Sequence, residues 1–226
     1  PTSTVINSYD SKFSRIESVQ NDWGTISYSY NPYVTSPGST PTTGGGRLAT
    51  VTNDVIANSN ITYAYDVLGR TVNRSINGAG NSITWAYDAM SRVTSEANAL
   101  GTFNYTYVDD TPGSSKGVTR LKSVGYPNSQ VTNYDWYDNN GDERLKTIDN
   151  LNPTGGTLSR FDYAYNPAGE ITQWQQQQNG GNDFHNFQYD LAGQLTSDQV
   201  GSGAPVRPYS KEFHYGYDAA ANRTSV

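Results

Sequence analysis

Oxygen-bearing side chains recur at short spacing between residues 138 and 149, and such a run could bind calcium. Asp138, Asn140 and Asp142 supply oxygens at alternate positions, and Asp149 follows further along the chain. Calcium loops take about six to eight oxygen ligands and place a glycine at the sharp turn in position six. Here that position is Glu143. The run therefore indicates an enlarged hairpin turn, with a calcium loop formed by the four oxygen-bearing residues as the alternative.

The chain has two histidines, His185 and His214, and no cysteine. Each histidine stands beside a phenylalanine where we expect a strand to start, so the two imidazoles could approach one another. Zinc sites usually have about three or four protein ligands, and no third ligand accompanies this pair. We therefore expect two histidines on strand faces, and neither a metal site nor histidine catalysis. The absence of cysteine excludes disulfides and thiolate chemistry.

Aspartates are numerous enough to suggest the paired carboxylates of a glycosidase. Almost all of them, however, belong to one repeated turn motif, so repetition explains their number. The glycine-rich stretches 44–46 and 201–203 are not phosphate loops, because no Lys-Ser/Thr follows them. We expect no catalytic residue, no cofactor and no enzymatic activity.

A tyrosine–aspartate motif recurs along the whole chain. Residues 61–70 read ITYAYDVLGR and residues 83–92 read ITWAYDAMSR. Similar copies follow near residues 165, 189 and 217. Counting one anchor tyrosine per copy gives nine units with spacings of 20 to 35 residues: Tyr9, Tyr30, Tyr65, Tyr87, Tyr107, Tyr137, Tyr165, Tyr189 and Tyr217.

Each unit has the pattern of a β-hairpin. The alternation of Tyr63 and Tyr65 with small residues has the period of two that is typical of a strand. Asp66 suits the first position of a type I turn, and Gly69 suits the left-handed position that closes it with a bulge. The chain then returns through a second strand. No helical periodicity exceeds two turns, so we predict an all-β fold.

Two short strands are not stable alone, so the units must stack on one another. A ladder of tyrosines across neighbouring hairpins would join them, because the ring packs while the hydroxyl can still reach water. This explains how a chain with a mean hydropathy of −0.71 can fold. We predict a single array of tandem antiparallel hairpins over residues 1–226, with polar loops such as 109–117 between units.

Composition excludes several classes of protein. A net charge of −6 and a pI near 4.8 oppose a nucleic-acid binder. No apolar run reaches the ~20 residues of a membrane span. A charged content of 16% with 12% aromatics does not fit intrinsic disorder.

The pattern [Tyr/Trp]-x-Tyr-Asp-x-x-Gly-Arg resembles that of the YD-repeat, or RHS-repeat, family. The best copies are residues 63–70 and 85–92, and the resemblance covers essentially the whole chain. Some positions depart from the pattern: Val108 and Asn166 stand in place of the aspartate, and Ser91 and, shifted by one place, Asn222 in place of the glycine.

The resemblance implies a strip of a curved or spiralling sheet that forms a hollow shell. Such shells occur in insecticidal toxin complexes, bacterial RHS polymorphic toxins and teneurins, and in the toxins they enclose a polypeptide cargo. The chain has no Asp-Pro-x-Gly shell-closing motif and no divergent effector region. We therefore expect a wall segment of a larger secreted or cell-surface protein, whose partners are the rest of the shell or its cargo.

An alternative is an adhesin-like or self-assembling surface protein. Rows of aromatic rings that include Trp85 and Trp174 could bind glycans by stacking. The unpaired backbone groups at the two ends of an open sheet could join other copies of the chain. We therefore expect the isolated chain to self-associate.

Overall fold

A computed structural model describes residues 4–108, 119–178, 181–203 and 209–225. In these ranges almost all regular structure is short antiparallel strands, with two single-turn 3₁₀ helices, η1 (Ala79–Asn81) and η2 (Asn139–Gly141). The predicted all-β fold of tandem hairpins is confirmed. The loop expected at 109–117 lies outside the described residues. No helix in the described ranges is long and apolar enough to cross a membrane.

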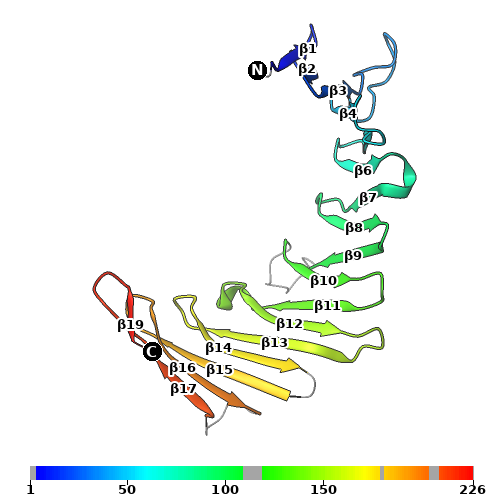
Figure 1. Ribbon diagram of the computed structural model, residues 1–226. Helices are drawn as coiled ribbons and strands as arrows, with labels where there is room; N and C mark the ends of the chain where they lie inside the picture. The colour runs from blue at the N-terminus through cyan, green and yellow to red at the C-terminus, as the bar shows by residue number, and fades with distance from the viewer. Residues whose placement is uncertain (1–3, 109–118, 179–180, 204–208, 226) are drawn as a thin grey trace. The chain divides into compact units, whose positions relative to one another are not determined.

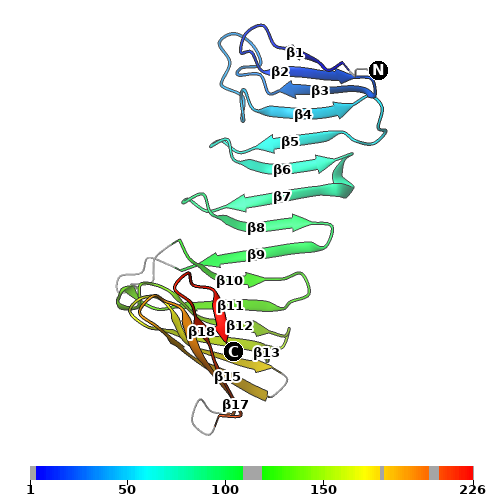
Figure 2. The same cartoon turned by 60° about the vertical axis from the view of Figure 1, so that its left-hand side comes forward.

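The chain forms two compact units, residues 1–103 and 104–226, which we describe separately. In the first unit each strand pairs with the next in chain order, so that the strands form a meander (Figures 1 and 2). Its strands are β1 (Ile6–Tyr9), β2 (Ile16–Asn21), β3 (Gly24–Tyr30), β4 (Leu48–Asn53), β5 (Ile61–Tyr65), β6 (Thr71–Ile76), β7 (Ser82–Tyr87) and β8 (Val93–Asn98).

The second unit is a meander of the same kind. Strand β9 (Gly101–Tyr107) crosses the boundary and pairs with β10 through residues 104–107. The last two strands form a separate small hairpin. The remaining strands are β10 (Leu121–Gly125), β11 (Val131–Trp136), β12 (Leu145–Leu151), β13 (Thr157–Tyr165), β14 (Ile171–Gln178), β15 (Gly181–Tyr189), β16 (Leu195–Ser202), β17 (Lys211–His214), β18 (Gly216–Tyr217) and β19 (Arg223–Ser225).

A β-bulge precedes the turn in most repeats. The register shifts between Ala64 and Tyr65 and between Ala86 and Tyr87 in the first unit, and between Ala164 and Tyr165 in the second. A bulge adds a residue to one strand and sharpens the local twist. The anchor tyrosine therefore takes the last strand position in each of these hairpins, beside the turn that follows it.

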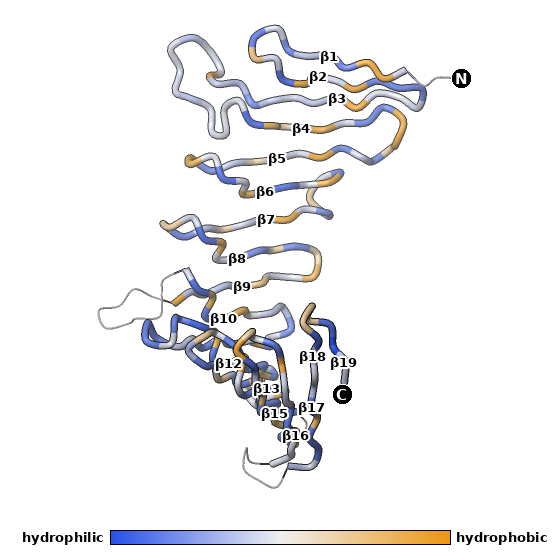
Figure 3. The backbone as a smooth tube through the Cα atoms, turned by 90° about the vertical axis from the view of Figure 1, so that its left-hand side faces the viewer, coloured by the Kyte–Doolittle hydropathy of each residue, from blue (hydrophilic) through white to orange (hydrophobic). Residues whose placement is uncertain are grey.

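The apolar interior is thin. Among the described residues the buried hydrophobic side chains are Val108, Val124 and Phe184. Figure 3 shows no long hydrophobic stretch along the backbone. Phe184 has no exposed surface, and its ring lies over Gly201, the residue opposite it on β16. With so little apolar burial, the polar contacts at the turns become important for holding each unit together.

Candidate functional site

The repeated turn is built around an aspartate side chain. Asp66 Oδ1 accepts hydrogen bonds from the backbone N–H groups of Leu68 and Arg70, both at 2.9 Å. The N–H of Gly69 donates to the carbonyl of Asp66 at 2.9 Å, and Gly69 has a φ of 75°. This is a type I turn closed by a left-handed residue. The roles expected for Asp66 and Gly69 are confirmed.

The same turn recurs at Asp88, Asp190 and Asp218, with paired backbone donors at 2.9 Å in each case. The sequence prediction for the last copy was wrong by one position. Ala221, with a φ of 63°, takes the left-handed place, and Asn222 takes the place of the arginine. Alanine in this conformation costs roughly 1–2 kcal/mol, which the contacts of the turn must offset.

The arginine at the end of a turn can reach two turns at once, as Arg70 does. Arg70 Nε donates to Asp66 Oδ2 of its own turn at 2.6 Å. Its Nη1 donates to the Asp88 carbonyl at 3.0 Å and to Ser91 Oγ at 3.1 Å in the next turn. The guanidinium also lies 4.6 Å from the centre of the Tyr87 ring, a cation–π distance. Arg70 thereby joins its own hairpin to the next one.

Other arginines repeat this link. Arg15 reaches the Gly46 carbonyl at 3.0 Å, Arg120 the Glu143 carbonyl at 2.7 Å, and Arg144 the Asn166 carbonyl at 2.9 Å. In every case the acceptor lies in a turn that follows later in the chain. The arginine contacts therefore run in one direction along each unit.

Electrostatics keep these aspartates ionised. Burial acts to raise the pKa of Asp66, but the backbone N–H and the guanidinium of Arg70 outweigh it and hold the pKa below its usual value. The same balance lowers the pKa of Asp88 through Arg92. For Asp10 the hydrogen bond from Arg15 is the largest cause of a lowered pKa.

The anchor tyrosines make a contact in the opposite direction, from one turn back to the preceding repeat. Tyr87 OH donates to the carbonyl of Thr71 at 2.7 Å, and Thr71 directly follows the arginine of the preceding turn. Equivalent bonds of 2.7–2.9 Å join further pairs. Burial raises the pKa of Tyr65 and of Tyr189. The predicted tyrosine ladder is present in both units, but its hydroxyls bond to backbone carbonyls rather than to water; its further pairs are Tyr30 with Ile16, Tyr65 with Leu48, Tyr189 with Ile171 and Tyr217 with Leu195.

One rung of the ladder is a tryptophan. Trp136 Nε1 donates to the carbonyl of Leu121 at 2.8 Å, and the strand bulge lies between Asp135 and Trp136. Tyr137, which the sequence indicated as the anchor, takes the position of the turn aspartate instead. Its hydroxyl donates to the Tyr163 carbonyl at 2.8 Å. The unit is therefore displaced by one residue from its sequence assignment.

The polarity of one turn is reversed. Asn166 stands where other turns have aspartate, and Glu170 stands where they have arginine. Asn166 Nδ2 donates to Glu170 Oε2 at 2.6 Å, so the donor and the acceptor have changed places. In the following turn Gln194 Nε2 donates to Asp190 Oδ2 at 3.0 Å. Complementary pairing is thus kept where the arginine is absent.

The structure does not bring the four residues of the possible calcium loop together. The Asp138 side chain accepts from the N–H of Asn140 at 3.0 Å at the start of η2. Asp142 pairs with Arg144. Asp149 lies within β12 between Asn133 and Arg160 of the flanking strands, about 13 Å past the start of that strand at ~3.3 Å per residue. These residues form the enlarged turn and the strand that follows it.

The two histidines lie on opposite faces of the second unit. His185 is paired with Val200 and His214 with Ser197 on β16, and side chains an odd number of residues apart point to opposite faces of a strand. Both histidines therefore lie on strand faces, as expected, but the two imidazoles do not approach one another. Over residues 4–108, 119–178, 181–203 and 209–225, no group of three or more His, Cys, Asp or Glu is placed to hold a metal ion.

His185 belongs to a row of rings on one face of the second unit. Its Nδ1 lies 2.9 and 3.0 Å from the two carboxylate oxygens of Asp198. Its ring lies 4.8 Å from Trp174 and 5.7 Å from Phe187. Phe161 extends the row, with its centroid 6.4 Å from that of Trp174. The sequence showed the aromatic residues but not the pairing of His185 with Asp198.

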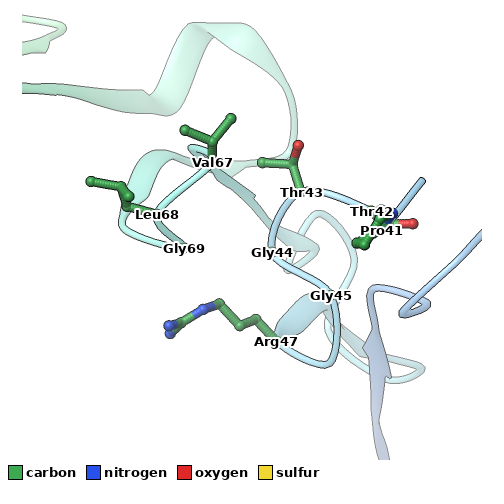
Figure 4. Close-up of a pocket in the computed structure, with 9 residues that line it drawn as sticks. All are labelled: Pro41, Thr42, Thr43, Gly44, Gly45, Arg47, Val67, Leu68 and Gly69. Atoms are coloured by element: carbon green, nitrogen blue, oxygen red, sulfur yellow. The ribbon is translucent and has the colours of Figure 1, made fainter.

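Cavities open beside the turns. One of about 330 Å³ lies between the glycine-rich loop that ends at Arg47 and the turn at Gly69 (Figure 4). Another, of about 770 Å³, is lined by residues that include Asn166, Glu170 and Tyr189. The sequence indicated neither cavity, because each is formed by turns from different repeats.

No family model and no curated protein matches the chain. Similar solved structures include TcdB2-TccC3-Cdc42, with 11% identity and a TM-score of 0.29 over 96% of this chain and 16% of that one. The Photorhabdus luminescens Tc holotoxin pore has 13% identity and a TM-score of 0.29 over 88% of this chain and 15% of that one. A porin-like protein from Bacteroides uniformis has 14% identity and a TM-score of 0.33, covering 78% of this chain and 82% of that one. The chain thus spans about one sixth of the two toxin chains.

Proposed function

We propose that the chain is a non-catalytic wall segment of a larger, extracellular YD-repeat protein that encloses a polypeptide cargo. The observation that carries the proposal is the two-way link between neighbouring turns. Arg70 reaches forward to the turn of Asp88, and Tyr87 reaches back to Thr71. Side chains repeated at this spacing serve to join hairpins to one another, which is what a continuous wall requires.

The state of the carboxylates supports a structural role. The aspartates of the motif are occupied by backbone N–H groups and by arginine or amide side chains of their own turns. The pKa values of Asp66, Asp88 and Asp218 are lowered, whereas a general acid at neutral pH needs a raised pKa. The cargo and the extracellular location follow from the resemblance to YD-repeat proteins and belong to the proposal.

The experiment is electron cryo-microscopy of the full-length product of the gene, combined with protease treatment. We expect a closed shell with this segment in its wall, and an enclosed polypeptide that resists the protease. The double variant Arg70→Ala/Tyr87→Phe should expose the cargo to cleavage. Met90→Ala, in the next turn and 56% exposed, is the matched control and should leave the cargo protected. A parent whose repeats enclose no space would refute the proposal.

A second candidate is glycan binding by the row of Phe161, Trp174, His185 and Phe187. These rings share one face of the second unit and are only partly buried, so parts of them stay open to solvent. A glycan array gives the test, with Trp174→Ala as the variant and Trp85→Ala as the control, since Trp85 is engaged with Glu96 at 3.0 Å. A signal lost only in Trp174→Ala favours this candidate, and no signal from the intact chain rejects it.

A further inference from the structure

Arg47 occupies the arginine position of a repeat whose turn is greatly enlarged. The N–H of Asn31 donates to the Arg47 carbonyl at 2.8 Å, and the N–H of Gly46 donates to the Asn31 carbonyl at 2.8 Å. These bonds match those that close the turn between Asp66 and Arg70. Gly46 has a φ of 76°, against 75° for Gly69. The segment 32–45 is therefore an insertion within an otherwise regular turn.

Arg47 lacks the carboxylate that other arginines of the series have. Five arginines at this position form ion pairs with Asp or Glu side chains: Arg15, Arg70, Arg92, Arg120 and Arg144. In the turn of Arg47 the aspartate is replaced by Asn31, whose amide is directed to the Gly44 carbonyl at 3.4 Å. Within the described part of the chain, the Arg47 guanidinium makes no ion pair and no hydrogen bond.

The Arg47 guanidinium, which lies 5.7 Å from the centre of the Tyr65 ring, is at a cavity. Figure 4 shows the Arg47 side chain extended from the glycine-rich loop past Gly69, and a Cβ added to Gly69 would lie 2.7 Å from Arg47 Nε. The cavity has a volume of about 330 Å³. Thr42, another lining residue, has a buried hydroxyl oxygen without a hydrogen-bond partner among the described residues.

We propose that this cavity binds an aspartate or glutamate side chain of a polypeptide segment that docks on the turns at Arg47 and Gly69. The guanidinium forms charge-assisted bonds with a carboxylate more strongly than with a neutral acceptor. The rim adds apolar surface, because Val67 is 89% and Leu68 64% exposed. A carboxylate next to an apolar side chain, as in a peptide, matches both features. This proposal does not depend on the proposed wall function.

The test is a titration of the intact chain, selectively labelled with ¹⁵N at arginine Nε, at low ionic strength. The probe is the blocked peptide acetyl-Ala-Asp-Leu-amide, compared with the same peptide carrying Asn. We expect a saturable shift of the Arg47 Nε–H resonance with the Asp peptide, and binding about tenfold weaker with the Asn peptide, as loss of one charge-assisted bond implies. The resonances of Arg70 and Arg92, which are already paired, should stay in place.

Two variants locate the binding. Arg47→Gln should abolish it, and Thr42→Val should weaken it. Lys12→Gln, which removes an exposed cation from another turn, is the matched control and should bind as the unmodified chain does. If Arg47→Gln does not fold, the shift of the Arg47 resonance in the unmodified chain decides the question by itself.

Three results with the peptides or the Arg47 variant would overturn the proposal, and a fourth comes from small anions. The Asn peptide could bind as tightly as the Asp peptide, the Arg47 resonance could stay unmoved at the highest peptide concentration, or Arg47→Gln could bind normally while folded. Sodium glucuronate and sodium sulfate form the remaining arms of the titration. If either binds more tightly than the Asp peptide, the site selects an acidic sugar or a simple anion, and the choice of a polypeptide is wrong.

Discussion

Arg70 and Tyr87 join the same two hairpins through opposite bonds. The Arg70 guanidinium donates forward to the carbonyl of Asp88, and the Tyr87 hydroxyl donates backward to the carbonyl of Thr71. The guanidinium lies 4.6 Å from the centre of the Tyr87 ring. The two side chains thus pack on one another while each bonds to the other's hairpin.

Tyr87→Phe tests the backward bond. The variant keeps the ring against Arg70 but leaves the Thr71 carbonyl without its donor, so we expect a loss of about 1 kcal/mol in the free energy of unfolding. Urea unfolding followed by circular dichroism measures this loss. Tyr9→Phe, at a tyrosine that is 56% exposed, is the control and should change stability by less than about 0.5 kcal/mol. Equal effects of the two variants would show that the hydroxyl bonds of the ladder do not stabilise the fold.

The turn of Asn166 and Glu170, in which donor and acceptor have changed places, predicts that a second substitution can restore the stability lost through a first. Asn166→Asp places a second carboxylate beside Glu170 and removes the donor in their 2.6 Å bond, so we expect a destabilisation of about 1–2 kcal/mol. Combining it with Glu170→Arg restores an opposite-charge pair and should recover most of this loss. Thermal unfolding of the two single variants and the double variant gives the coupling. Additive losses in the double variant would show that the two positions do not act as a pair.

Gly201 is needed because the Phe184 ring fills the space beside it. A Cβ on Gly201 would lie 2.2 Å from Phe184 Cζ, so Gly201→Ala must displace a fully buried ring. We expect a loss of roughly 2 kcal/mol or more, in the range of overpacked cores. Gly80→Ala is the control, since nothing lies within 4 Å of its added Cβ. A Gly201→Ala variant as stable as Gly80→Ala would contradict the packing described for Phe184.

The lowered pKa values of the turn aspartates predict acid sensitivity. Asp10, Asp66, Asp88 and Asp218 each have a pKa below the usual value when folded. Their contribution to stability is therefore present above the unfolded-state pKa of about 4 and is lost as the pH falls through the lower folded-state values. We expect stability to be nearly constant from neutral pH to about pH 5 and to fall steeply below pH 4.

The raised pKa values of the tyrosines predict a second loss in alkali. Burial raises the pKa of Tyr65, Tyr165 and Tyr189. Their contribution is present below the unfolded-state pKa of about 10 and is lost as the pH rises through the folded-state values. Denaturant midpoints measured from acid to alkaline pH check both predicted losses of stability. If stability did not fall at either extreme of pH, the turn aspartates and the anchor tyrosines would not change environment on folding.

The terminal strands predict association. Strands β1 and β17 are exposed along their whole length, and exposed strand edges bind other strands. We expect the isolated chain to elute from a size-exclusion column as a concentration-dependent oligomer. Asn7→Lys, which places a charge at an exposed position of β1, should reduce association, because charged side chains on an edge strand oppose pairing with another strand. A monomer at the highest concentration tested would contradict this expectation.

The hairpins could be predicted from the sequence because their signals are local. Alternation up to Tyr65 and the Asp-x-x-Gly pattern after it act within a few residues. The assignment of Tyr137 failed because Trp136 and Tyr137 both suit a strand end, and only the bulge between Asp135 and Trp136 distinguishes them. A bulge depends on the partner strand, which the local pattern does not describe.

Beyond the tyrosine ladder, the contacts between repeats could not be predicted from the sequence. An insertion hides the fact that Asn31 and Arg47 close one turn, so the missing carboxylate is invisible in the sequence. The His185–Asp198 contact and the opposite faces of the two histidines depend on strand register, and a shift of one residue would reverse every face.

The direction of the arginine contacts has a mechanical consequence. In the first unit, each hairpin from Arg15 to Tyr87 is joined to the next by a phenol hydroxyl at the turn, and at Arg15 and Arg70 by a guanidinium as well, with little apolar packing to share a load. When the chain is pulled from its ends, we therefore expect the hairpins of this unit to separate one after another rather than all together. Each separation would free one repeat of about 20 to 35 residues, or about 70 to 120 Å of extended chain, and the force at each step would measure the strength of the contacts that join one hairpin to the next.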